Sequence, residues 1–431
     1  LVDAGRPEVV SVRPNEFRNV KPKILVKDGD TVQLGQPLFH DRNRPEVRFP
    51  SPAAGEVVEV RYGRRRVCQQ IFIKVAASET AVEHKSWSPG DARKLNRAQL
   101  VEAMLDSGLW TSLRQRPFSV IADPEAVPEG IFIAASDNDP LPFDADLALD
   151  GREEDFQLGI DLLGKLTEGK VHLCHLRGGG KSRALSGATG CEKHSFSGPY
   201  PAGSIEAQIH YVLPYKKGRT VWYLDCQDVA ALGEFFRTGA YPVTRVVAVG
   251  GEAAVERKHY RTRRGVSADF LQDGKGHLKR KRVVSGSVLG GGKKVTSTGG
   301  LGHYDNKFSI LPEGDQPEFV GWMLPGFDKV SRFRAYASAP TATKPRSLNT
   351  NLGGGVRAHV ATGIYEDVCA LDILPAHLMK SVLAVDFEEM EALGLHDCAE
   401  CGLCTFVCPS KIEFGDIIQS GIEEFLKEEE G

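Results

Sequence analysis

Short apolar runs alternate with turn residues over positions 22–60, a pattern that predicts short β-strands rather than helices. Aspartate, glycine and proline separate one run from the next. The expected strand positions are Ile24–Val26, Val32, Leu38–His40, Val47–Phe49 and Glu56–Val60. We therefore expect the N-terminal part of the chain to be built from short strands joined by turns.

The spacing of apolar residues becomes helical farther along the chain, where four of them recur at helix spacing: Leu95, Leu100, Met104 and Leu105. Three apolar runs then predict strands, at Gly130–Ala135, Val171–Leu176 and His210–Pro214. A helical stretch, Asp155–Leu166, lies between the first two runs. Strands that alternate with helices in this way indicate an α/β domain.

The C-terminal half begins with a predicted strand at Thr244–Val249 and a helix start at Ser267–Leu271. Beyond residue 330 three further segments predict helices, at Pro375–Leu383, Glu388–Leu393 and Ile417–Lys427. The last segment carries its apolar residues on one stripe, and such a stripe more often packs into a core than contacts a cofactor. We expect it to pack on the rest of the C-terminal region.

Composition narrows the possible classes of protein. The chain has 431 residues, 41% of them hydrophobic and 26% charged, which is ordinary globular composition for three or four domains. The formal net charge of −3 argues against a nucleic-acid binder. No stretch approaches the roughly 18 apolar residues of a membrane-spanning helix. Nine cysteines without a signal-peptide pattern fit a reducing cytoplasm better than a disulfide framework.

Four of these cysteines form the most specific motif in the chain. The segment Cys398-Ala399-Glu400-Cys401-Gly402-Leu403-Cys404-Thr405-Phe406-Val407-Cys408-Pro409 has the spacing C-x₂-C-x₂-C-x₃-C-P, which is typical of ferredoxin-type [4Fe–4S] ligands. A structural zinc site is the alternative, although zinc ligands usually divide into two separate C-x₂-C pairs. The spacing favours iron–sulfur.

A single run of this kind does not identify the residue that would be the fourth ligand of the cluster. In two-cluster ferredoxins the fourth cysteine of each run binds the other cluster, so Cys398, Cys401 and Cys404 would supply only three ligands to their own. Cys369, which is followed by a short apolar stretch and Pro375, is the candidate for the fourth. The alternative is Cys408, if the run folds back on its own cluster.

Two glycine-rich segments do not predict nucleotide binding. The segment Gly178–Ser182 follows a predicted strand, but His175 stands where a phosphate-binding loop requires its first glycine. A surface loop is the better interpretation. The segment Ser285–Gly292 predicts a tight turn between strands. No arrangement of side chains indicates an acid–base or hydrolytic site, and catalytic residues remain unassigned.

The N-terminal segment resembles a biotinyl/lipoyl domain in the stretches Val26–Leu38 and Pro50–Gly55. Such domains carry a modified lysine at a hairpin tip. The corresponding position here falls near Arg44, and arginine cannot form the amide bond to lipoate or biotin. The resemblance therefore implies a structural domain without the prosthetic group.

Several phrases together resemble the A-type component of the Na⁺-translocating NADH:quinone reductases (Na⁺-NQR), with a more distant likeness to the C subunit of the Rnf electron-transfer complex. These phrases are Ser107–Phe118, Gly198–Gly203, Arg282–Leu289 and Cys404–Pro409. The resemblance implies a multidomain α/β and α+β protein with four domains. They are a barrel-sandwich hybrid (lipoyl-like) domain at 1–90, a Rossmann-like α/β domain at 91–240, a β-grasp (SLBB-like) domain at 241–330 and a helical ferredoxin-like domain at 331–431.

The resemblance also implies a function. The chain would lie at the cytoplasmic face of the bacterial inner membrane as a peripheral component of the complex, bound to the membrane-embedded subunits of Na⁺-NQR. It would take part in electron transfer to quinone coupled to Na⁺ export, and quinone would be the substrate. Alternatives are a non-catalytic scaffold with a vestigial cluster motif and an Rnf-type ferredoxin:NAD electron-transfer subunit.

The family resemblance predicts no FMN or NAD site in this chain. Flavin-binding relatives have a glycine-rich loop where this chain has Leu113–Phe118. Bulky side chains there would block the approach of a phosphate group to backbone N–H donors.

Overall fold

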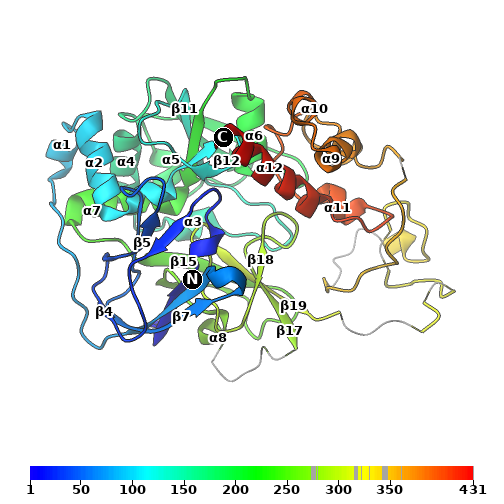
Figure 1. The fold of residues 1–431 in the computed structure, drawn as a ribbon, viewed down its shortest axis with the longest axis horizontal. Helices are drawn as coiled ribbons and strands as arrows, with labels where there is room; N and C mark the ends of the chain where they lie inside the picture. The colour runs from blue at the N-terminus through cyan, green and yellow to red at the C-terminus, as the bar shows by residue number, and fades with distance from the viewer. Residues whose placement is uncertain are drawn as a thin grey trace.

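Four β-sheets and a group of C-terminal helices make up the computed structural model (Figure 1). It describes residues 1–272, 278, 280–314, 319–321, 323–329, 331–341, 348–360 and 362–430. No helix in these ranges is both long and apolar enough to cross a membrane.

Two antiparallel sheets form most of the N-terminal region. One contains, in spatial order, β2 (Val9–Val12), β8 (Cys68–Val75), β7 (Gly55–Tyr62) and β4 (Thr31–Val32), and the other contains β3 (Pro22–Ile24), β5 (Pro37–Asp41) and β6 (Arg48–Pro50). Their apolar side chains share one core, in which the rings of Phe39 and Phe49 stack with centroids 4.3 Å apart. The short strands expected over residues 22–60 are confirmed, with small shifts of their ends.

The turn between β5 and β6 carries Arg44. Its Nε lies 3.7 Å from Oδ2 of Asp41, a buried carboxylate that also accepts hydrogen bonds from the backbone N–H groups of Lys21 and Asn43. Asp41 therefore holds this turn in place, and the position near the tip presents a guanidinium rather than an amine.

The third sheet has six strands in the order β10 (Val120–Ile121), β9 (Arg114–Arg116), β14 (Val221–Asp225), β11 (Gly130–Ala134), β12 (Lys170–Leu176) and β13 (Glu192–Phe196). The last four strands are parallel, and their order is that of half a doubly wound α/β fold. Helices α4 (Glu153–Leu163) and α7 (Cys226–Thr238) cover one face, and α6 (Ile205–Val212) covers the other. The predicted α/β domain is confirmed.

One predicted strand in this region is wrong. The run His210–Pro214 begins inside helix α6, whose residues Ile205 and Ile209 pack against Phe132 in the sheet. Isoleucines four residues apart lie on one helical face, and that spacing starts upstream of the run. A five-residue window was too short to reveal the helical period.

The fourth sheet has the order β1 (Val2–Asp3), β16 (Lys258–Arg263), β15 (Thr244–Gly250), β19 (Lys307–Pro312), β17 (Lys281–Ser285) and β18 (Lys293–Val295). Its first strand comes from the N-terminus and pairs with β16. The predicted strand at 244–249 and the helix α8 (Ala268–Leu271), capped by Ser267, are both confirmed. Buried Asp228 on α7 bonds both Arg245 of β15 and Arg264, which fixes this sheet to the α/β domain.

The C-terminal helices are α9 (Pro375–Ala384), α10 (Phe387–Ala392), α11 (Leu403–Val407) and α12 (Phe414–Glu430). The three helices predicted in this region are confirmed. The apolar stripe of α12 packs on α9 through Ile418, Ile422 and Val382, as expected. In Figure 1 this group lies beside α6 of the α/β domain.

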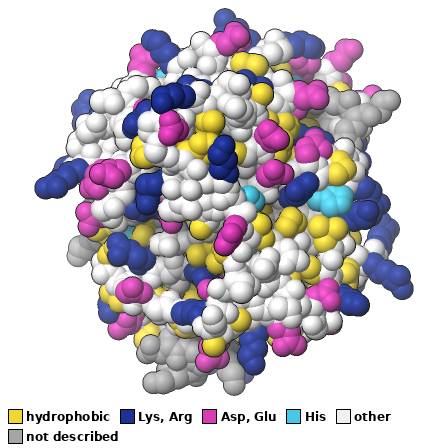
Figure 2. All heavy atoms as spheres, turned by 90° about the vertical axis from the view of Figure 1, so that its left-hand side faces the viewer, with side chains coloured by type: hydrophobic (Ala, Val, Ile, Leu, Met, Phe, Trp, Pro, Cys, Tyr) yellow, Lys and Arg dark blue, Asp and Glu magenta, His cyan; other side chains and the backbone are white. Residues whose placement is uncertain are grey.

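The remaining described elements are short. They are α1 (Pro89–Ala92), α2 (Arg97–Ser107), α3 (Ala145–Ala148), α5 (Arg183–Gly187), η1 (Pro14–Glu16), η2 (Arg64–Arg66), η3 (Leu109–Ser112) and η4 (Ala339–Thr341). Positive and negative side chains are interspersed over the face shown in Figure 2, without a continuous basic area on that side. A mixed surface of this kind fits the small net charge and gives no footprint for nucleic acid there.

Arg44 generates the first testable prediction. Intact-mass measurement of the chain should show no lipoyl or biotinyl adduct, because a guanidinium cannot form the required amide. An added mass that peptide mapping places within residues 40–50 would contradict this prediction.

Candidate functional site

The cysteine loop, residues 398–404, connects α10 to α11 and contains three of the candidate ligands. Gly402 adopts a φ of +74° there, a left-handed conformation that favours glycine. The side chains of Cys398, Cys401 and Cys404 are half-buried, as is that of Cys369. Cys408, at the end of α11, is fully buried.

The thiols of Cys369, Cys398, Cys401 and Cys404 lie close enough to influence one another's charge. Burial is the main reason why the pKa of each of the four thiols is raised, to about 12 for Cys404. Repulsion from Cys369 contributes to the raised pKa of both Cys401 and Cys404, and repulsion from Cys401 and Cys404 contributes at Cys398.

Backbone N–H groups approach each of the four thiols. The donors are the N–H groups of Leu371 for Cys369, Glu400 for Cys398, Leu403 for Cys401 and Thr405 for Cys404, and each lowers the pKa of its thiol against the larger effect of burial. An N–H group directed at sulfur stabilises the thiolate, which is the form that binds metal. Hydrogen bonds to sulfur also tune the potential of iron–sulfur sites.

Cys408 has a different environment. Its Sγ is 3.3 Å from the Tyr365 hydroxyl and accepts a hydrogen bond of 3.3 Å from the N–H of Ile412. It packs in an apolar cluster with Tyr365 and Phe414, whereas Cys369 and Cys398 border the cluster built on α9 and α12. Cys404 also packs against the cluster that contains Cys408, so it lies between Cys408 and the other three candidate ligands.

The spacing of the thiols bears on the zinc alternative. A tetrahedral Zn²⁺ with Zn–S bonds of about 2.3 Å draws its sulfur ligands to about 3.8 Å from one another. Within the described part of the chain, no three cysteine sulfurs lie within 4.8 Å of one another. This arrangement is wider than a single zinc ion requires.

Two arginines from distant parts of the chain fix the cysteine loop. Arg18, just after η1, donates two hydrogen bonds of 2.8 and 2.7 Å to the carboxylate of Glu400, and a third to the carbonyl of Phe118. Arg116, on β9, donates to the carbonyls of His396 at 2.7 Å and Cys398 at 3.0 Å. Sequence reasoning missed both arginines as site residues.

Two further segments contact the loop from the other side. The hydroxyl of Tyr200 donates to the carbonyl of Cys401 at 2.9 Å. A Cβ on Gly402 would lie 1.9 Å from the carbonyl oxygen of Leu289, and one on Gly290 would lie 2.7 Å from that of Glu400. The segment Ser285–Gly292 is the turn between β17 and β18, as predicted, and its glycines additionally allow the cysteine loop to approach it closely.

A cleft of about 660 Å³ opens beside the cysteine loop. Cys401 lines it, together with Ala134 and Ser136 at the carboxyl end of β11. Strand β11 is where the strand order of the parallel sheet reverses, the usual ligand position in open α/β folds. The candidate cysteine site therefore borders the cleft in which this fold would be expected to bind a ligand.

The segment Leu113–Phe118, interpreted above as a lost flavin cradle, is filled by side-chain packing. Leu113 is fully buried, and the guanidinium of Arg114 lies 4.5 Å from the ring centroid of Tyr223 and 4.4 Å from that of Tyr304. Phe118 is buried among residues of the C-terminal helices. The segment connects domains and exposes no row of free backbone donors.

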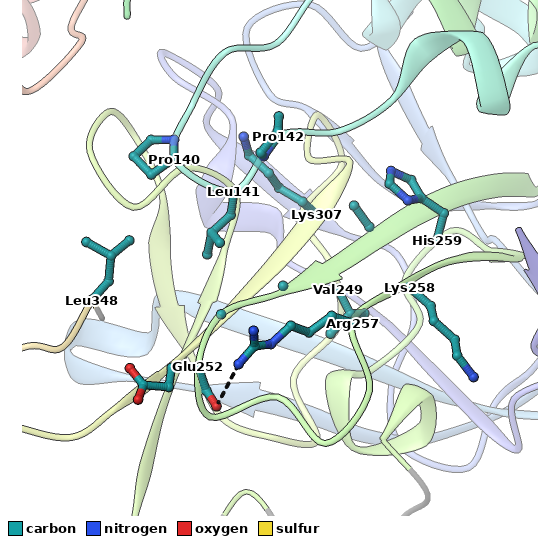
Figure 3. A pocket seen from close by; sticks show the side chains of 13 residues that line it. Pro140, Leu141, Pro142, Val249, Glu252, Arg257, Lys258, His259, Lys307 and Leu348 are labelled. Atoms are coloured by element: carbon teal, nitrogen blue, oxygen red, sulfur yellow. Dashed lines mark hydrogen bonds between the residues drawn. The ribbon is translucent and has the colours of Figure 1, made fainter. Parts of the chain in front are cut away.

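A second cavity, of about 590 Å³, lies between the loop Pro140–Pro142 and the fourth sheet (Figure 3). Its basic side chains already have partners: Lys307 pairs with Asp137 and Asp139, Lys258 pairs with Glu256, and Arg257 donates to the Glu252 carbonyl. Carboxylates neutralise Lys307 and Lys258, so these two side chains give little attraction for an anionic ligand.

The glycine-rich segment Gly178–Ser182 leads into the five-residue helix α5, which ends at Gly187. Ser182 caps this helix by accepting a hydrogen bond from the N–H of Leu185. A phosphate-binding loop normally leads into a longer helix than this one.

The Arg18–Glu400 pair generates the second prediction. Burial raises the pKa of Glu400, but the hydrogen bonds and charge of Arg18 outweigh burial and leave the pKa below its ordinary value. Arg18→Met should therefore destabilise the protein by about 2 kcal/mol at pH 7, because Glu400 loses a charged partner while mostly buried. Urea unfolding followed by circular dichroism measures this change.

Arg61→Met is the matched control, because Arg61 also bonds Glu59 through both carboxylate oxygens, but at an exposed position. This substitution should lower the free energy of unfolding by less than about 0.5 kcal/mol. The depressed pKa of Glu400 contributes stability above about pH 4.3, its unfolded value, and that contribution disappears as the pH falls through the folded pKa. A deficit in Arg18→Met that persists unchanged at pH 3 would contradict this explanation.

The packing of Leu113–Phe118 generates the third prediction. The isolated chain should retain no stoichiometric FMN through gel filtration and should show no micromolar NADH binding by calorimetry. Flavin that co-elutes with the protein in a one-to-one ratio would show that the cleft accepts it despite Arg114.

Known proteins resemble this chain over nearly its whole length. Residues 1–76 match the family described as the NqrA N-terminal barrel-sandwich hybrid domain, and residues 95–241 match the NqrA second alpha/beta domain. The NqrA protein of the Na(+)-translocating NADH-quinone reductase from Saccharophagus degradans is 38% identical over 415 residues, which cover 96% of this chain and 92% of the relative.

Two other relatives carry the same name. The protein from Hahella chejuensis is 38% identical and aligns over 99% of this chain and 96% of its own length. The protein from Rhodopirellula baltica is 37% identical, with coverage of 97% and 92%. With this identity maintained along both chains, the chain belongs to the NqrA family of the Na⁺-translocating NADH-quinone reductases.

Proposed function

We propose that this chain is a redox subunit of a Na⁺-translocating NADH-quinone reductase, and that Cys369, Cys398, Cys401 and Cys404 hold a [4Fe–4S] cluster. In this role it takes part in electron transfer to quinone, coupled by the whole complex to Na⁺ export. The names of the relatives support the assignment to the complex. A bound cluster would supply one-electron transfer, which none of the protein's side chains offers by itself.

The observation that carries the proposal is the environment of the four thiols. Neighbouring thiols among the four raise one another's pKa, and each thiol has a nearby backbone N–H group. A cluster of several irons spreads its ligands more widely than one zinc ion, which agrees with the separation of these sulfurs.

Cys369 is preferred to Cys408 as the fourth ligand. Cys369 acts electrostatically on Cys401 and Cys404. The Sγ of Cys408 already accepts a hydrogen bond from the N–H of Ile412 and contacts the Tyr365 hydroxyl, in an apolar cluster against which Cys404 also packs.

The cleft beside Cys401 is the proposed route by which a redox partner approaches. Cys401 is the only one of the five candidate cysteines among the residues that line the cleft. Electron transfer requires a short separation between centres, and the cleft wall is where a partner group comes nearest. We place the chain at the cytoplasmic face of the membrane, bound to membrane-embedded subunits, and retain the β-grasp and ferredoxin-like assignments as part of this proposal.

A scaffold function is the second candidate. The arginine and glycine contacts of the cysteine loop involve no thiol group, and they would hold the loop in place whether or not iron is bound. In that case the four cysteines would be a vestige. An Rnf-type role is a further alternative, but the chain has a single complete ferredoxin run where that protein has two.

The fourth prediction separates these candidates. Anaerobically prepared protein should be brown, contain about four iron and four sulfide per chain, and give a low-temperature EPR signal on reduction. Cys369→Ser should abolish the cluster or convert it to a [3Fe–4S] form. Cys408→Ser should leave the EPR signal largely intact.

Cys191→Ser provides the control for substitution of a half-buried cysteine far from the loop, and it should leave iron content unchanged. The opposite pattern, with loss on Cys408→Ser alone, would mean that the run closes its own cluster. Colourless protein without iron after anaerobic preparation would favour the scaffold function.

A further inference from the structure

A second group of metal-ligating side chains lies on the edge of the parallel sheet, away from the cysteine loop. His172 belongs to β12, and Glu192 and His194 belong to the edge strand β13. Residue 192 is the register partner of residue 172, and residues 192 and 194 point to the same face because side chains alternate along a strand. The three ligand atoms all lie within 4.8 Å of one another.

The distances within this group suit a single ion. Nδ1 of His172 is 2.9 Å from Nε2 of His194 and 3.8 Å from Oε2 of Glu192. Tetrahedral Zn²⁺ with bonds of about 2.0–2.1 Å places neighbouring ligand atoms about 3.4 Å apart. The imidazoles would separate by about 0.5 Å and the carboxylate would approach by about 0.4 Å, which are side-chain adjustments without a change in the strands.

The rings are held in the orientation that a metal requires. His172 stacks on Phe132 with ring centroids 4.4 Å apart, and a Cβ on Gly130 would lie only 3.3 Å from its ring. The two facing ring nitrogens, Nδ1 of His172 and Nε2 of His194, share one hydrogen bond in this structure. A cation between them could replace that hydrogen and bind both nitrogens.

We propose that His172, Glu192 and His194 form a Zn²⁺ site with one open coordination position. Two imidazoles and a carboxylate are a common zinc ligand set, and open sites keep three protein ligands. The Glu192 side chain is 46% exposed, so solvent reaches the group from the side of the edge strand. The site lies at the amino ends of β12 and β13, whereas the cleft beside Cys401 lies at the carboxyl end of the sheet.

Lys170 competes with a bound ion for the carboxylate of Glu192. Its Nζ lies 3.1 Å from Oε2 of Glu192, the same oxygen that faces His172. The ammonium group thus occupies a carboxylate that the metal needs and also repels a cation electrostatically. Removing this charge should strengthen zinc binding, whereas a purely structural role for the two histidines predicts no such effect.

The test uses the full chain, with its cysteine thiols either occupied by the reconstituted cluster or alkylated, so that they do not bind the added metal. Isothermal titration with Zn²⁺ should show one equivalent bound to the wild type. Co²⁺ should give visible absorption bands without a thiolate charge-transfer band. His194→Gln should lower the affinity at least tenfold, as expected when one of three ligands is lost.

Lys170→Met should raise the affinity at least fivefold. Removing one unit charge about 4 Å from a divalent ion in water corresponds to roughly thirtyfold, and salt screening reduces that figure. His40→Gln is the control for loss of a half-buried histidine outside the site, and it should bind zinc as the wild type does. Equal binding by wild type and His194→Gln, or unchanged or weaker binding by Lys170→Met, would overturn the proposal. A thiolate band with Co²⁺ that disappears in Cys401→Ser would place the ion at the cysteines and overturn it as well.

Discussion

The close contact of the backbone at Gly402 with the carbonyl of Leu289 is the constraint on which the cysteine site depends. A Cβ at position 402 would lie 1.9 Å from that oxygen, far inside the limit for nonbonded atoms. The loop can therefore lie against the β17–β18 turn only with glycine at this position, and Gly290 makes the reciprocal approach to Glu400. Three side chains add hydrogen bonds to this region. Arg18 bonds the carboxylate of Glu400, Arg116 bonds the carbonyl of His396, and Tyr200 bonds the carbonyl of Cys401. The positions of the thiols thus depend on contacts from several parts of the chain and not on the C-terminal helices alone.

The two arginines also bear on the charge of the site. Four thiolates bring negative charge into a region that burial has partly removed from water, as the raised pKa values of the cysteines indicate. Guanidinium groups remain charged at any physiological pH. The charge of Arg18 is balanced by Glu400, whereas Arg116 bonds only carbonyl groups of this region and provides a fixed positive potential there. Net charge and hydrogen bonding are two of the means by which a protein sets the potential of an iron–sulfur centre. The same contacts that position the loop would then also help to set the reduction potential of a bound cluster.

Local patterns in the sequence predicted much of the fold, because strand and helix periods are properties of short segments. The strands over residues 22–60, the α/β alternation and the C-terminal helices all appear in the structure. The failure at His210–Pro214 came from a window that began inside α6 and so contained too little of its period. The cysteine motif was visible because its ligands lie close together in sequence. Arg18 and Arg116 were not predictable in this way, since their partners lie hundreds of residues away and one of them bonds only backbone carbonyls.

The sequence segments that carry the family resemblance nevertheless contain residues that make these long-range contacts. Arg116, Tyr200 and Leu289 each lie within one of those phrases, and all three contact the cysteine loop. The segment Leu113–Phe118 shows these contacts most clearly. Its bulky side chains were interpreted as the loss of a cofactor cradle, but in the structure Arg116 and Phe118 hold the cysteine-bearing region against the α/β domain. The side chain of Arg116 bonds the cysteine-bearing region, and the carbonyl of Phe118 bonds Arg18, which in turn holds Glu400. Packing between the domains therefore accounts for the bulky side chains of this segment without reference to a cofactor.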